Sequence, residues 1–379
     1  MTKIQKSIKI LGIETSCDET AAAIITAKIK NKKVKIRNSE PRLKIKILSN
    51  VVASQIDLHR KYGGVYPELA SRAHLENILP VISAALDQAR IKIVDLDAIA
   101  VTVGPGLIGS LLIGTETART LAWAFSKLLI GINHLEGHIF ANFVGENSKY
   151  QQLTINNQLF PILNLIVSGG HTSLILMKDF GKYQTIGQTR DDAAGEAFDK
   201  VAQLIGLPYP GGPSIEAATL KKIKNQKSKI KIRIQNLKLP RPMIDSEDFD
   251  FSFSGLKTAV LKLTKELGPK LVNKYQAEIA AEFQKAVTEV LVSKTIAAAK
   301  KYRVKTIMLS GGVAANSQLR RDFESIIHNS KFMIHFLAPA KKLSTDNAAM
   351  IAVAGLFHFL KKEISNPFQI QASSNLKLS

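Results

Sequence analysis

The chain has 379 residues and a single cysteine, Cys17, and both facts limit what it can be. A length of 379 residues exceeds what one hydrophobic core usually fills, so two domains are expected. One cysteine excludes an internal disulfide and any site built from several cysteines, so a bound metal would need histidine and carboxylate ligands. No apolar run approaches the ~20 residues of a membrane-spanning helix, and we expect a cytoplasmic protein without membrane contact.

The formal net charge of +21 is concentrated in two basic segments. Residues Lys28–Lys46 hold nine Lys or Arg against one acid, and residues Lys221–Arg241 hold nine and no acid. Both segments read as insertions or elongated loops. They fit the electrostatic footprint of a protein that binds RNA, and a solvated surface rich in lysine is the alternative.

Four apolar runs of strand character each end in a turn rich in Gly, Ser or Thr, which is typical of a strand that delivers a loop to a ligand. In chain order the runs are Ile8–Ile13, Ala98–Val103, Ile162–Val167 and Thr306–Leu309. The first and third turns are followed directly by further apolar runs, Ala21–Ile25 and Ser173–Met177, which predicts two hairpins. A helix is expected after the second and fourth turns.

Apolar periodicity predicts one helix in each half, at Glu68–Arg90 and at Ala193–Ile205. The halves share one order of hairpin, helix, strand and glycine-rich turn. We therefore expect two duplicated α/β domains, residues 1–150 and 151–346, with an active-site cleft for a nucleotide between them. A closing helix at Asn347–Lys361 is expected to return to the first domain.

His134 and His138 stand four residues apart in a predicted helix, His134–Phe143, so only ~40° separates their rings around its axis and both can reach one cation. Two buried or capping histidines are the alternative. Glu136 falls about 180° from the midpoint of the rings, where it cannot act as the general base of a His-Glu-x-x-His protease. Asp346 is the candidate third ligand, although an Asp at this place also suits the N-cap of the closing helix.

Seven motifs resemble those of the tRNA N6-adenosine threonylcarbamoyltransferase family. They are Ile13–Thr20 (IETSCDET), the His134/His138 pair, Ser168–Thr172 (SGGHT), Gly195–Lys200 (GEAFDK), Pro210–Pro213 (PGGP), Phe251–Lys257 (FSFSGLK) and Ser310–Asn316 (SGGVAAN). The resemblance extends from about Ile8 to about Leu360. It implies two RNase H-like domains of the fold shared by actin, Hsp70 and sugar kinases.

The resemblance also implies a reaction, the transfer of a threonylcarbamoyl group from threonylcarbamoyl-AMP to N6 of the adenosine 3′ to the anticodon, in tRNAs that read codons starting with A. It implies one divalent metal ion per subunit, Fe2+ or alternatively Zn2+, bound by His134, His138 and Asp346. The adenylate would be bound by Ile166, Val167, Ser168, Gly169, Gly170, Asp199, Gly212 and Asn316.

His171 and Asp18 are candidate catalytic helpers, with purely structural roles as the alternative. The partners that the resemblance implies are tRNA, the smaller paralogue TsaB and the ATPase TsaE. TsaB would bind through the predicted helices Glu68–Arg90 and Leu107–Phe125, which carry more apolar surface than one sheet face needs.

Three other functions stay open at this point. A metalloprotease or glycoprotease is the main alternative, and the position of Glu136 argues against it. An ATP-dependent sugar or acetate kinase fits the fold but gives no reason for the histidine pair. A non-catalytic paralogue should lack that pair.

Overall fold

The computed structural model describes residues 7–30, 42–144, 153–154, 159–224, 237–329 and 333–378. The chain divides into two units: unit 1 comprises Met1–Gln158 and Pro339–Ser379, and unit 2 comprises Leu159–Ala338. These limits differ from the boundaries expected at residues 150 and 346. As a consequence, Asp346 belongs to the unit that carries His134 and His138, and not to the other one.

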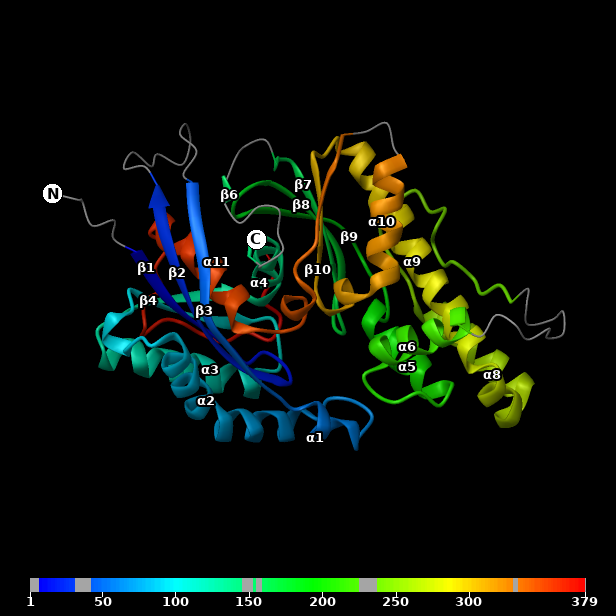
Figure 1. Ribbon diagram of the computed structural model, residues 1–379, viewed down its shortest axis with the longest axis horizontal. Helices are drawn as coiled ribbons and strands as arrows, with labels where there is room; N and C mark the ends of the chain where they lie inside the picture. The colour runs from blue at the N-terminus through cyan, green and yellow to red at the C-terminus, as the bar shows by residue number, and fades with distance from the viewer. Residues whose placement is uncertain are drawn as a thin grey trace. The chain divides into compact units, whose positions relative to one another are not determined.

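Unit 1 is built on a six-stranded sheet in the order β5-β4-β1-β2-β3-β6 (Figure 1). Its strands are β1 (Ser7–Glu14), β2 (Glu19–Lys30), β3 (Arg42–Ser54), β4 (Ala98–Gly104), β5 (Leu128–Asn133) and β6 (Leu153–Thr154). The first three strands pair antiparallel, β4 pairs parallel with β1, and β5 pairs parallel with β4. The hairpin predicted from the first two apolar runs is thus confirmed as β1 and β2.

Helices cover both faces of this sheet. They are α1 (Ile56–Arg60), α2 (Pro67–Ala89), α3 (Ile108–Ala124), α4 (His134–Phe140) and α11 (Ala348–Lys361). Ile78 of α2 and Ala118 of α3 share one core with Leu11 of β1. Successive strand residues point to opposite faces, so Gly12 faces α11 instead. A Cβ on Gly12 would lie 2.2 Å from the carbonyl oxygen of Ala348, and only glycine allows α11 to begin so close to β1.

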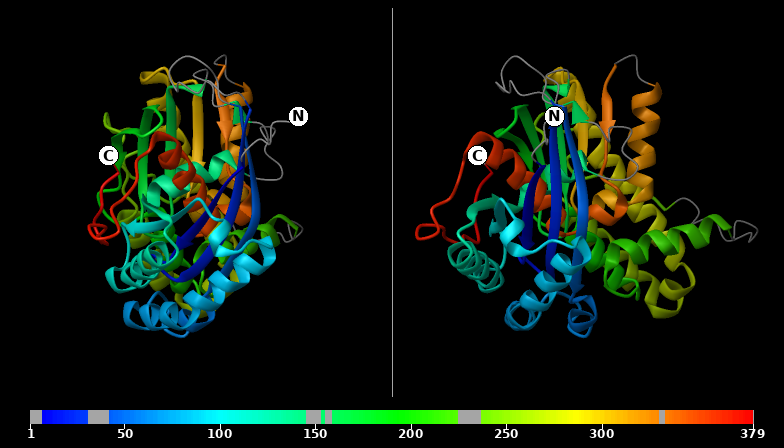
Figure 2. Two further views of the ribbon diagram at one scale, coloured as in Figure 1. Left: turned by 90° about the vertical axis from the view of Figure 1, so that its left-hand side faces the viewer. Right: turned by 60° about the vertical axis from the view of Figure 1, so that its left-hand side comes forward.

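The chain after α11 runs beside β4 and β5 (red in Figure 2). Ser365 bridges Leu129 of β5, and the backbone N–H of Ser373 donates to the carbonyl of Val103. Gly104 has φ +147°, and a Cβ there would lie 2.0 Å from the carbonyl oxygen of Ser373. This segment therefore holds the ends of the two strands that lead into α3 and α4.

Unit 2 repeats the plan with a five-stranded sheet in the order β11-β10-β7-β8-β9. Its strands are β7 (Ile162–Val167), β8 (Thr172–Asp179), β9 (Lys182–Gln188), β10 (Thr306–Ser310) and β11 (His335–Leu337). The first three pair antiparallel, β10 pairs parallel with β7, and β11 pairs parallel with β10. The arrangement matches β1 to β5 strand for strand, so the predicted duplication of an RNase H-like sheet is confirmed.

The helices of unit 2 pack on the face of the sheet that carries Leu163 and Leu165. They are α5 (Ala194–Leu204), α6 (Gly211–Lys224), α8 (Ser254–Lys274), α9 (Gln276–Lys301) and α10 (Ser317–Asn329). The rings of Phe198 and Phe283 meet edge to face at 5.2 Å in this core. The helix predicted at Ala193–Ile205 is confirmed as α5. No helix among the described residues has the length and hydropathy to cross a membrane.

The middle parts of the two basic segments, residues 31–41 and 225–236, lie outside the described residues. The ends of the first segment are strand and not loop, because Lys28 of β2 and Lys44 of β3 are backbone partners. The expectation of a loop therefore does not hold at these flanks.

Arg241, the last residue of the second basic segment, is built into unit 2. Its guanidinium lies 2.5 Å from Glu282 and 2.6 Å from Glu289, and its side chain is only 12% exposed. The charge of Arg241 is thus neutralised by two acids of α9. This residue belongs to the fold of unit 2 and not to an exposed basic surface.

Candidate metal centre and nucleotide cradle

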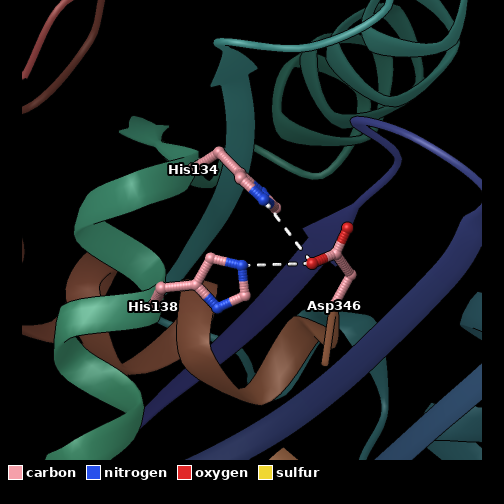
Figure 3. Close-up of side chains that lie close together, drawn as sticks. All are labelled: His134, His138 and Asp346. Carbon is pink, nitrogen blue, oxygen red and sulfur yellow. Dashed lines mark ion pairs between the residues drawn. The ribbon is translucent and has the colours of Figure 1, made fainter. Parts of the chain in front are cut away.

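Unit 1 brings together the three residues that the sequence singles out as metal ligands (Figure 3). His134 and His138 project from α4, and Asp346 stands two residues before α11. Asp346 Oδ1 lies 3.1 Å from Nε2 of His138 and 3.5 Å from Nε2 of His134. One candidate ligand atom from each residue lies within 4.8 Å of the other two, so one ion can contact all three.

Helix α4 is fixed at both ends of its short length. It begins directly after β5, where Asn133 caps it by accepting a hydrogen bond from the N–H of Leu135. At its far end Phe140 packs on Phe357 of α11 with ring centroids 4.5 Å apart. The helix predicted to Phe143 changes after Phe140 into a 3-10 turn. Capping and packing together fix the rotation of α4 about its axis, so that the two histidines lie on the side where the chain enters α11.

The N-cap of α11 is Asn347 and not Asp346. Asn347 Oδ1 accepts from the N–H of Met350 at 3.1 Å, and Asn347 Nδ2 donates to the carbonyls of Leu343 and Thr345. The capping role that the sequence left open for Asp346 therefore belongs to its neighbour. The carboxylate of Asp346 points instead at the two imidazole rings (Figure 3).

The hydrogen bonding of His138 fits a metal ligand. The residue is 1% exposed, yet within the described part of the chain neither of its ring nitrogens has a hydrogen bond of acceptable geometry. Its Nε2 is close to Asp346 but not aligned for a hydrogen bond. Leaving a buried imidazole without hydrogen bonds costs free energy, whereas a cation bound at Nε2 would use the lone pair. The residues present therefore fit a metal ion.

A second carboxylate, Glu14, lies behind His134. It ends β1 and is fully buried, and its Oε2 is 3.0 Å from Nδ1 of His134. The hydroxyl of Thr102 donates to the same oxygen at 2.6 Å, and the N–H of Ser16 donates to Oε1 at 2.5 Å. Glu14 stands inside a motif that the sequence singles out, but without an assigned role. The sequence feature that could have pointed to Glu14 is an acidic residue directly at the end of a strongly apolar strand.

Electrostatics favours a positive charge between these carboxylates. Burial alone would lower the pKa of His134, but the charges of Glu14 and Asp346 outweigh it and raise that pKa to about 9. Burial alone would raise the pKa of Glu14, but the charge and the hydrogen bond of His134 hold it below its ordinary value. Both shifts have one cause, which is the attraction between buried carboxylates and a cation beside them.

Two further acids lie next to this group, Asp18 in the turn after β1 and Glu19 at the start of β2. Burial and the charges of Asp346 and Asp18 raise the pKa of Glu19 well above its ordinary value. Neither Asp18 nor Glu19 belongs to the group of converging ligand atoms found among the described residues. His74 of α2 holds the turn, because its Nε2 donates to the carbonyl of Cys17 at 2.9 Å. A catalytic role for Asp18 stays a prediction.

In unit 2, several of the residues predicted to bind the adenylate follow the carboxyl ends of β7 and β10, which are parallel neighbours. The turn after β7 is closed by a hydrogen bond from the N–H of Ser168 to the carbonyl of His171. Gly311 follows β10 with φ +89°, and a Cβ there would lie 2.5 Å from the carbonyl oxygen of Val167. The carboxyl ends of adjacent parallel strands are where open α/β sheets usually bind ligands.

The glycines around this place fall into two groups. In the first group a Cβ would lie 2.4 to 2.5 Å from a backbone atom, and its members are Gly195, Gly211 and Gly311. In the second group a Cβ would meet no atom within 4 Å, and its members are Gly169, Gly170, Gly212 and Gly312. Packing explains the first group only. At the second group, which we call the glycine cradle, no side chain covers the backbone N–H groups.

Other residues predicted to bind the adenylate form hydrogen bonds within unit 2. Asp199 Oδ1 accepts from the N–H of Gly211 at 2.6 Å. Asn316 accepts from two N–H groups in the first turn of α10 and donates to Gln284 at 2.8 Å. Ile166 is fully buried in β7, as is Val167, so only their backbone can face a ligand. Direct contacts of these side chains with an adenylate stay predictions.

Comparison with known proteins agrees with the geometry. The sequence profile of the family described as tRNA N6-adenosine threonylcarbamoyltransferase matches residues 46–353. The proteins of that name from Syntrophomonas wolfei subsp. wolfei and Clostridium novyi are each 46% identical, over 379 and 377 residues, and the alignments cover 99% of this chain and of each relative. The structure of HypF from T. kodakarensis is similar in fold alone, with a TM-score of 0.56 and 14% identity over 95% of this chain and 48% of that one. This chain belongs to the tRNA N6-adenosine threonylcarbamoyltransferase family.

Proposed function

We propose that the protein transfers the threonylcarbamoyl group of threonylcarbamoyl-AMP to N6 of the adenosine 3′ to the anticodon in tRNAs that read codons starting with A. The acyl transfer to tRNA is the activity in the family's name. The observation that supports it best is the convergence of His134, His138 and Asp346 in unit 1. These residues come from two distant parts of the chain. The alignment with the relative from Syntrophomonas wolfei covers 99% of both chains, so it includes both parts.

The reaction is an acyl transfer from a mixed anhydride. N6 of the adenosine attacks the carbamoyl carbon, the bond from that carbon to the phosphate oxygen breaks, AMP leaves and N6 loses a proton. A divalent cation, Fe2+ or alternatively Zn2+, would supply Lewis acidity to an oxygen of the reacting group. His134, His138 and Asp346 would hold this ion, since three protein ligands leave coordination positions for a substrate. The charges of Glu14 and Asp346 together would balance those of a divalent ion.

The glycine cradle of unit 2 would bind the AMP part of the donor. Backbone N–H groups at Gly169 and Gly170 can approach a phosphate because no side chain stands in the way. The N-terminus of α6, at Gly211 and Gly212, adds a dipole that favours an anion. His171 stands in the same turn as the first two glycines, where it suits a hydrogen bond to the donor.

The activity is tested by incubating tRNA with this protein, threonine, bicarbonate, ATP and the other proteins of the pathway, and then digesting the tRNA. Mass spectrometry of the nucleosides should detect threonylcarbamoyladenosine with the wild type and none with the His134→Ala/His138→Ala variant. Unmodified tRNA with an active pathway and wild-type protein would contradict the proposal. Cleavage of a glycoprotein added to the same protein would favour the protease alternative.

The glycine cradle is tested by adding one methyl group. Gly169→Ala and Gly212→Ala should each weaken AMP binding, measured by calorimetry, by about tenfold, the effect of losing a hydrogen bond to a charged group. Their melting temperatures should match the wild type because the new Cβ meets no protein atom. Gly255→Ala, whose Cβ would meet only Pro242 at an ordinary contact distance of 3.8 Å, is the control and should bind AMP normally. Normal AMP binding by both cradle variants would place the adenylate elsewhere.

A protein partner is part of the proposal. Helices α2 and α3 pack on each other and expose large apolar side chains: Leu75 is 66% exposed, Leu79 62%, Ile108 49% and Leu112 45%. Exposed apolar groups on adjoining helices are typical of a protein interface. We assign this surface, the α2/α3 face, to the smaller paralogue TsaB, with TsaE as a transient partner of the assembly.

A further inference from the structure

We propose that Glu14 is a positioning residue of the metal centre, whose carboxylate orients His134 so that Nε2 faces the cation. This inference rests on the proposed metal site and extends it beyond the three ligands. Glu14 touches neither the ion nor a substrate, and acts only through the imidazole of His134.

The two nitrogens of the His134 ring have different surroundings. Nδ1 lies 3.0 Å from Oε2 of Glu14 and 3.1 Å from the hydroxyl oxygen of Ser16, whereas Nε2 lies 3.5 Å from Oδ1 of Asp346. An ionised carboxylate can only accept hydrogen bonds, and Glu14 is the nearer of the two carboxylates, so in the neutral ring that binds a metal the proton is held at Nδ1 and the lone pair is left at Nε2. A metal-binding histidine usually donates its other N–H to a carboxylate or a carbonyl in this way. The tautomer required for metal binding is therefore selected by the protein.

Glu14 is itself held on two sides. Thr102 of β4 donates to Oε2, and the N–H of Ser16, in the turn after β1, donates to Oε1. Burying a carboxylate is costly unless such donors satisfy it. These two hydrogen bonds, one to each oxygen, hold the carboxylate in place, and its Oε2 in turn fixes the plane of the His134 ring.

The ring of the second histidine, His138, is held differently, so the inference applies to His134 alone. Within the described residues His138 Nδ1 has no hydrogen-bond partner, so no carboxylate behind this ring orients it as Glu14 orients His134. A change at Glu14 should therefore disturb one ligand and leave the other unchanged. Metal binding should weaken and not vanish.

The test measures Co2+ binding to the metal-stripped full chain by visible absorption. Glu14→Gln keeps the volume of the side chain but removes its charge and lets an amide N–H face the ring. We expect affinity for Co2+ to fall by about 10- to 100-fold, with a shifted absorption spectrum. Thr102→Val, which removes one donor to Glu14, should change the affinity in the same direction by less.

Glu136→Gln is the matched control. Glu136 is also buried and also hydrogen-bonded to a histidine, His358, which is outside the metal group. This variant should bind Co2+ like the wild type. If Glu14→Gln fails to fold, as judged by its melting curve, the Co2+ affinity of Thr102→Val still tests the role of Glu14, because this variant leaves the carboxylate in place.

Wild-type affinity in both Glu14→Gln and Thr102→Val, with loss in His134→Ala, would overturn the role of Glu14 and leave the metal site standing. Equal weakening by Glu136→Gln would also overturn it, since the effect would then come from any lost buried charge. A wild type that binds no Co2+ would overturn both the metal site and this inference. The acyl transfer assay would then show separately whether the activity survives.

Discussion

Nε2 of His358 lies 2.8 Å from Oε2 of Glu136, and this hydrogen bond joins α11 to α4 beside the histidine pair. The carboxylate of Glu136 is buried and engaged with α11. This agrees with its place about 180° around the helix from the midpoint of the His134 and His138 rings. It is not placed as the general base of a protease.

The same contact predicts how stability depends on pH. Burial alone would lower the pKa of His358, but its hydrogen bond to Glu136 and the charges of Glu136 and Glu363 raise it above the ordinary 6.5. A raised pKa gives stability that is complete below the unfolded pKa and is lost as pH rises through the folded pKa. His358→Gln should therefore lower the free energy of unfolding more at pH ~5.5 than at pH ~9. Urea unfolding of both proteins at several pH values measures this, and a loss that is constant with pH would contradict it.

Metal content should depend on the histidine pair. His134→Ala/His138→Ala should lower bound metal to background, because two of the three converging ligands are lost. The fold should stay largely intact, as shown by circular dichroism. His59→Gln is a control, since His59 is also buried in unit 1 but is hydrogen-bonded to Gln55. Elemental analysis that finds wild-type metal in the double variant would reject the site.

Gly12 should be needed for both stability and metal binding. A Cβ at this position would lie 2.2 Å from the backbone of Ala348, so Gly12→Ala must push the start of α11 away. We expect a loss of about 1–3 kcal/mol in the free energy of unfolding, as for other overpacked sites, and weaker metal binding because Asp346 moves with α11. Gly64→Ala, whose Cβ would meet no atom within 4 Å, should change neither. Equal melting curves for the two variants would refute the expectation.

The α2/α3 face should be needed for partner binding. Leu75→Glu/Leu79→Glu puts two charges on adjacent turns of α2, where both side chains are exposed, so folding should not suffer. Co-purification with the paralogue should weaken by about tenfold or more, as expected for central positions of an interface. Phe368→Glu, at an even more exposed apolar position in the C-terminal segment, is the control. An intact complex in the double variant would place the interface elsewhere.

The basic segments should contribute to tRNA binding through charge alone. We expect weaker binding and a flatter dependence on salt, by roughly 0.9 in log-log slope for each duplex phosphate contact that is lost. Metal content and AMP binding should stay normal. The two variants to compare are Lys32→Ser/Lys33→Ser/Lys35→Ser and Lys227→Ser/Lys229→Ser/Lys231→Ser. Filter binding across a salt series measures the slope, and an unchanged slope in both variants would leave these lysines as a solvated surface.

Much of the fold could be predicted from local pattern. The apolar runs at Ile8–Ile13 and Ile162–Val167 became β1 and β7 because a strand buried on both faces needs a continuous apolar run. The turns after them, rich in Gly, Ser or Thr, marked the places where the strands end. The spacing of His134 and His138 placed both rings on one face of α4, since helix periodicity is a local property.

Other features were decided only by the tertiary structure. Asp346 faces the histidines because Asn347 takes the N-cap of α11 and because Gly12 lets that helix begin against β1. Glu14 meets His134 only through the pairing of β1 with β4 and of β4 with β5, which leads into α4. Spacing along a chain determines what one helix or strand presents. Contacts between residues far apart in sequence depend on close packing, which no local pattern contains.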